Sequence, residues 1–100
     1  TGRTLFEAAF AGGAKALGRD GSGLAVGAPA DLISLAEGHP NLTAKAGDGL
    51  LDSWIFSVGT AGVDCVWTAG VKRVEAGRHV NRDRTAEQFR AVIRDLVAII

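Results

Sequence analysis

Histidine and cysteine, the commonest zinc ligands, are scarce in this chain. A catalytic zinc site needs about three side chains of His, Asp, Glu or Cys together with an open position for water. The 100 residues contain two histidines, His39 and His79, and a single cysteine, Cys65. The motifs typical of zinc sites, such as H-x-H, H-E-x-x-H and C-x-x-C, do not occur. We therefore assign no metal ligand, and expect His39 in a loop before Pro40 and His79 at the end of a strand.

Nucleophilic catalysis has no clearer signature. Cys65 falls in an apolar strand pattern, where a buried and inert thiol is expected rather than a reactive one. The serines are not surrounded by a catalytic motif; they are Ser22, Ser34, Ser53 and Ser57. We therefore assign no catalytic residue and predict that the chain has no activity of its own.

Three glycines, Gly21, Gly23 and Gly27, come close to a dinucleotide-binding pattern. That pattern requires a strand before the glycines and a helix after them, because the helix amides bind the pyrophosphate. Here a predicted helix precedes the glycines and predicted strands follow them. The order of elements favours a plain turn, so no cofactor-binding residue is assigned.

Charged side chains offer two further candidates. A basic strip also contains His79, and it could contact phosphates or an acidic partner; its members are Lys72, Arg73, Arg78, Arg82 and Arg84. Charge also protects exposed hairpin edges from unwanted strand pairing, and we favour that role. Asp31 at a strand entrance could be a functional carboxylate, but capping of the turn after Pro29 is the simpler role.

Charge balance and the single cysteine narrow the choice of compartment and partner. Eleven basic residues against eleven acidic ones create no overall field that would attract nucleic acid or an anionic membrane. One cysteine excludes an internal disulfide and fits a reducing compartment. The sequence has no apolar run of the roughly 18 to 20 residues that cross a bilayer, and no signal-peptide pattern. We expect a cytoplasmic protein without nucleic-acid or membrane partners.

The first half of the chain predicts helix, strand and helix. Thr4 and Glu7 form a capping-box pattern at the start of a helix over residues 4–18, and Gly12 and Gly13 within it indicate close approach of another backbone. Two strands, a long loop and a short helix capped by Asp48 are expected next. They cover residues 24–26, 30–35, 36–49 and 50–58.

The second half predicts a hairpin, a further short strand and a final helix. They cover residues 63–68, 71–75, 78–80 and 83–100. Gly70 supplies the positive φ of the hairpin turn, and Thr85-x-x-Gln88 is a capping pattern for the final helix. The whole chain is thus expected to be one α+β unit.

The order of motifs resembles the amidohydrolase superfamily. Residues 12–18 (GGAKALG) and 23–33 (GLAVGAPADLI) resemble the segment where those enzymes leave their barrel and enter a small β domain. Residues 48–56, 63–67 and 76–79 are most similar to the formiminoglutamate deiminase family, and the loop with His39-Pro40 fits as well. The resemblance covers essentially the whole chain.

The resemblance implies a zinc-dependent hydrolase of histidine degradation, which adds water to a C=N carbon and releases ammonia to give N-formyl-L-glutamate. Such enzymes hold their metal at the ends of barrel strands. Those motifs are absent here, so no site residue carries over, and zinc is expected only in the full-length parent. The resemblance makes residues 4–18 a late barrel helix, 24–80 a portion of the β domain (a partial β-sandwich), and 83–100 a C-terminal helix near the barrel or a subunit contact.

The composition agrees with a partial domain. Of the 47 apolar residues 17 are Ala, which leaves 30 with side chains large enough to fill core volume well. A further 14 positions are Gly and add no side-chain volume. With no Met and Thr1 at its start, we expect a piece of a longer protein. Its partners would be the remainder of the parent chain and, through an open strand edge, other copies of itself. Two alternatives stay open: a different amidohydrolase parent, of imidazolone, guanine or cytosine-deaminase type, or a free-standing interaction module that uses the basic strip.

Overall fold

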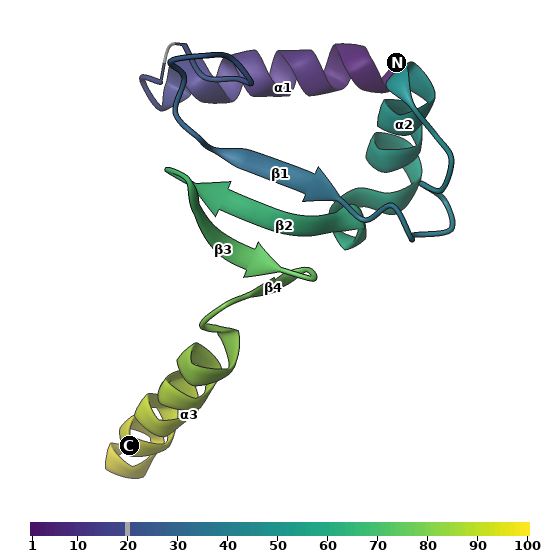
Figure 1. Ribbon diagram of the computed structural model, residues 1–100. Coiled ribbons are helices and arrows are strands. Elements are labelled where there is room, and N and C mark those ends of the chain that lie inside the picture. Colours follow the sequence, from purple (N-terminus) through teal and green to yellow (C-terminus); the bar gives the residue numbers. More distant parts are fainter. Residues whose placement is uncertain (20) are drawn as a thin grey trace.

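Helices stand at both ends of the chain, with an antiparallel sheet between them (Figure 1). The computed structural model describes residues 1–19 and 21–100; Asp20, in the polar connection after the first helix, lies outside the described residues. The elements are α1 (Gly2–Ala16), β1 (Leu32–Leu35), α2 (Gly47–Ser53), η1 (Trp54–Val58), η2 (Gly59–Gly62), β2 (Val63–Thr68), β3 (Val71–Glu75), β4 (Arg78–His79) and α3 (Arg82–Ile99). Within the described residues the strands lie in the order β1-β2-β3-β4. The predicted α+β class is confirmed.

Helix α1 begins two residues before the predicted start. Its N-cap is Thr1, whose hydroxyl oxygen accepts a hydrogen bond from the Thr4 amide at 3.3 Å. The predicted capping box is therefore wrong, because Thr1 satisfies the first free amides and Thr4 is already helical. Glu7 pairs instead with Arg3 at 3.5 Å. Gly18 follows the helix with a φ of +65°, as a terminating glycine does.

Close backbone approach occurs at Gly2 and not at the predicted glycines. Among the described residues nothing lies within 4 Å of a Cβ placed on Gly12 or Gly13, whereas a Cβ on Gly2 would meet the Leu51 carbonyl oxygen at 2.7 Å. The Gly2 amide also donates to the Asp52 carboxylate at 2.7 Å. The first turn of α1 is therefore seated on α2.

The strand expected at 24–26 does not form. Residues 24–26 lie in bends and turns, and the flanking Gly23 and Gly27 have φ values of +132° and +85°, which break an extended run. The next strand is shorter than the predicted 30–35, because the Asp31 amide donates to Pro29 in a tight turn just before β1.

The short helix after the loop is confirmed, but its cap is not. Helix α2 has Ala46 at its N-cap without a side-chain hydrogen bond, and Asp48 lies inside the first turn. Arg3 binds the Asp48 carboxylate from α1, which removes it from a capping role. The helix widens into η1, where the Trp54 indole donates to the Gly59 carbonyl at 3.1 Å.

The hairpin has the predicted bounds, with β2 and β3 joined through Ala69 and Gly70. Both turn residues have positive φ, +48° and +78°, which matches a tight turn between twisted strands. A second turn at Ala76 and Gly77 repeats this geometry and leads into β4. The expected strand 78–80 is thus present as its first two residues.

Helix α3 begins one residue before the predicted start. Asn81 is its N-cap, and the Thr85 amide donates to the Asn81 carbonyl at 2.9 Å. The predicted Thr85-x-x-Gln88 cap is therefore wrong, since Thr85 is already within the helix.

The described residues bury little apolar surface. The buried hydrophobic side chains among them are Leu42 and Cys65. The accessible surface is 7469 Å², against about 5,400 Å² expected for a compact monomer of this mass. The radius of gyration is 17.5 Å, against about 13 Å for a compact chain of 100 residues. The thin core inferred from composition is therefore a property of the fold.

Candidate functional site

The two histidines stabilise local turns. The Nδ1 atom of His39 accepts a hydrogen bond from the Asn41 amide at 3.1 Å, and that of His79 accepts from the Asn81 amide at 3.0 Å. In each case one ring nitrogen of the imidazole accepts a hydrogen bond from the backbone amide two residues later. Within the described ranges, 1–19 and 21–100, no three His, Cys, Asp or Glu side chains gather as a metal site would require. The residues present do not fit a zinc ion.

Cys65 lies buried in β2, as predicted for a structural thiol. Its amide donates to the Ser34 hydroxyl at 3.1 Å, which ties β1 to β2 at the irregular register between Ile33 and Leu35. Ser34 therefore substitutes for a ladder hydrogen bond. The Ser22 hydroxyl donates to the Arg19 carbonyl at 2.7 Å, Ser53 accepts from Lys45 at 2.6 Å, and Ser57 accepts from Asn41 at 3.3 Å.

The glycine-rich segment is a sequence of turns. Gly21, Gly23 and Gly27 all have positive φ, and the chain continues from them into β1. The helix N-terminus that a pyrophosphate would need does not follow these glycines. The predicted plain turn is confirmed at the described positions.

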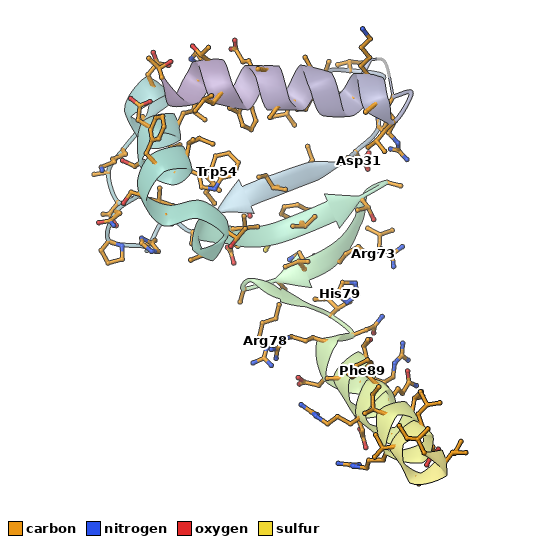
Figure 2. The ribbon with its side chains drawn as sticks, turned by 180° about the vertical axis from the view of Figure 1, so that it is seen from behind. Asp31, Trp54, Arg73, Arg78, His79 and Phe89 are labelled. Atoms are coloured by element: carbon orange, nitrogen blue, oxygen red, sulfur yellow. The ribbon has the colours of Figure 1, made fainter. Side chains whose placement is uncertain are left out.

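The basic strip is partly neutralised by its own neighbours. Arg78 pairs with Asp83 at 3.1 Å, and Lys72 pairs with Glu75 at 3.8 Å and lies 5.5 Å from the Trp67 ring centroid. The side chains of Arg73 and Arg78 leave the ribbon in different directions (Figure 2). These groups therefore do not converge on one anion.

Asp31 occupies the most connected polar position, where α1, β1 and the hairpin meet. One carboxylate oxygen accepts from the Ala69 amide at 2.8 Å, and the other accepts from Arg19 at 2.7 Å. The expected role as a turn cap is correct in kind, but the turn is the β2–β3 hairpin and not the one after Pro29. No pattern in the sequence indicated that Asp31 would contact Arg19 or Ala69.

An apolar pocket of about 290 Å³ opens beside this carboxylate. It lies between the C-terminal half of α1 and the loop that leads to β1; its lining includes Phe10, Ala14, Leu17, Pro29 and Asp31. Arg19, which pairs with Asp31 at 2.7 Å, also lines the pocket. An open pocket of small and apolar side chains suits packing by another segment of protein.

Further apolar surface surrounds Trp54. The Trp54 side chain lies between α1 and the sheet (Figure 2), with the Phe6 ring centroid at 5.6 Å.

At the start of α1, the Asp48 carboxylate raises the pKa of Arg3 above its ordinary value, chiefly through a hydrogen bond and then through charge. Arg3 therefore stays charged and holds α1 to α2.

The strand order leaves β1 with a hydrogen-bonded neighbour on one side within the described residues. Its other edge is open on the side where α1 lies (Figure 1). An edge of this kind accepts a further strand. The β1 edge and the pocket beside Asp31 are therefore the candidate functional surfaces of this chain. In the described part of the chain, no helix is both long and apolar enough to cross a membrane.

Comparison with known proteins identifies related chains. No family model matches the sequence. Formimidoylglutamate deiminase of Pseudomonas aeruginosa is 45% identical over 96 residues, which are 96% of this chain and 21% of the relative. A crystal structure of an amidohydrolase from Brucella melitensis superposes with a TM-score of 0.82 at 45% identity, again over 96% of this chain and 21% of that one. This chain thus spans about a fifth of the length of each, and the resemblance to amidohydrolases is confirmed.

Proposed function

We propose that this chain, which matches a segment of an amidohydrolase in sequence and in fold, is the part of a formimidoylglutamate deiminase that builds its small β domain. Its role in this proposal is structural. It packs against the rest of the enzyme and supplies no catalytic residue. The 45% identity across 96% of the chain carries the proposal.

The surface of the chain supports a structural role. It exposes about 2,000 Å² more than the roughly 5,400 Å² expected for its mass, and the edge of β1 and the pocket beside Asp31 are open. Exposed surface of this extent, which includes large apolar side chains such as Leu17, Leu24 and Phe56, is normally covered by protein. The remainder of the parent chain is the partner that we propose for it, with a strand paired to β1.

The chemistry of the proposed parent is the addition of water to the C=N carbon of N-formimino-L-glutamate, with release of ammonia. The proposal assigns the zinc of that reaction to the remainder of the parent, because within residues 1–19 and 21–100 no three His, Cys, Asp or Glu side chains gather. The same proposal places the chain in histidine degradation and, with its free thiol, in the cytoplasm.

A chimera tests this proposal directly. The corresponding segment of the Pseudomonas aeruginosa relative is replaced by these 100 residues, and ammonia release from N-formimino-L-glutamate is measured. We expect a folded and active enzyme, because the two segments share 45% of their residues. The control is the relative with the segment deleted, which should fail to fold. A well-folded chimera without deiminase activity would contradict the proposal.

The chain by itself provides the complementary measurement. Purified alone, it should contain no stoichiometric zinc and should release no ammonia from N-formimino-L-glutamate. Turnover by the isolated chain would disprove the structural role.

The second candidate function is a free-standing interaction module that uses the basic strip. Ion pairs within the chain argue against it, because they neutralise part of the strip. Arg78 and Arg82 both face Asp83, at 3.1 and 4.0 Å. A salt-dependent interaction with nucleic acid or an acidic protein, lost on Arg78→Ala and Arg82→Ala, would support this candidate.

A further inference from the structure

We draw no further inference here: the strongest candidate, the exposed apolar face of helix α3 around Phe89, Ile93 and Leu96, which projects from the β4 end of the sheet (Figure 1), carries none because nothing in the structure shows what covers it.

Discussion

Removal of the Asp31 side chain should loosen the junction of helix, strand and hairpin. The carboxylate accepts the Ala69 amide at 2.8 Å and Arg19 at 2.7 Å. A hydrogen bond to a charged group contributes about 1.5 kcal/mol at the low end of its range, and exposure of this site reduces that to about 1 kcal/mol. The ion pair, with Asp31 and Arg19 side chains 39% and 57% exposed, adds about 0.5 kcal/mol. Asp31→Ala should therefore cost about 1.5 kcal/mol.

Two matched variants separate the contributions of the hydrogen bond and of the ion pair to the free energy of unfolding. Asp31→Asn keeps an oxygen for the Ala69 amide and loses the charge, and Arg19→Gln removes the ion pair alone. Both should cost about 0.5 kcal/mol. In urea, with a slope of about 1.5 kcal/mol per molar, Asp31→Ala lowers the unfolding midpoint by about 1 M. Emission of Trp67, two residues before Ala69, reports the transition. Equal midpoints for Asp31→Ala and Arg19→Gln would refute the stabilising role of the Ala69 hydrogen bond.

Three further substitutions and one thiol-labelling measurement test the packing. Gly2→Ala should lower the melting temperature, because its Cβ would meet the Leu51 carbonyl oxygen at 2.7 Å, while Gly12→Ala should raise it by the equivalent of about 0.5 to 1 kcal/mol; a loss of stability in the second variant would contradict the open space around that glycine. Ala69→Gly relieves a φ of +48° and should stabilise the hairpin by about 0.5 to 1 kcal/mol in urea titrations. The buried thiol of Cys65 should react with a thiol reagent at least tenfold more slowly in native chain than in urea-unfolded chain, and equal rates would show that β2 is open.

The local elements followed closely from sequence where one short-range signal dominated. The hairpin has its predicted bounds because alternating apolar residues flank Gly70, which adopts the positive φ that the turn needs. Helix α3 has its predicted period because apolar side chains recur along it at helical spacing. The termini of the helices were predicted less well. Thr1 and Asn81 compete with other capping residues a few positions later, and small differences in free energy decide between them.

The candidate site depended on contacts that no short pattern contains. Asp31 and Ala69 are 38 positions apart, and Gly2 and Asp52 are 50 apart. Glycine patterns indicated close packing at Gly12, yet the contact forms at Gly2, because the position of α2 decides which part of α1 is approached.

Sequence alone determined that this chain has two histidines, one cysteine and none of the usual zinc motifs, and that 17 of its 47 apolar residues are Ala, since residue types and their numbers do not depend on folding. It also determined the resemblance to amidohydrolases, because ordered motifs are a linear property. Only the tertiary structure decided which surfaces are left without partners. The exposed edge of β1 and the free face of α3 result from where strands and helices end in space, and that position depends on all long-range contacts together.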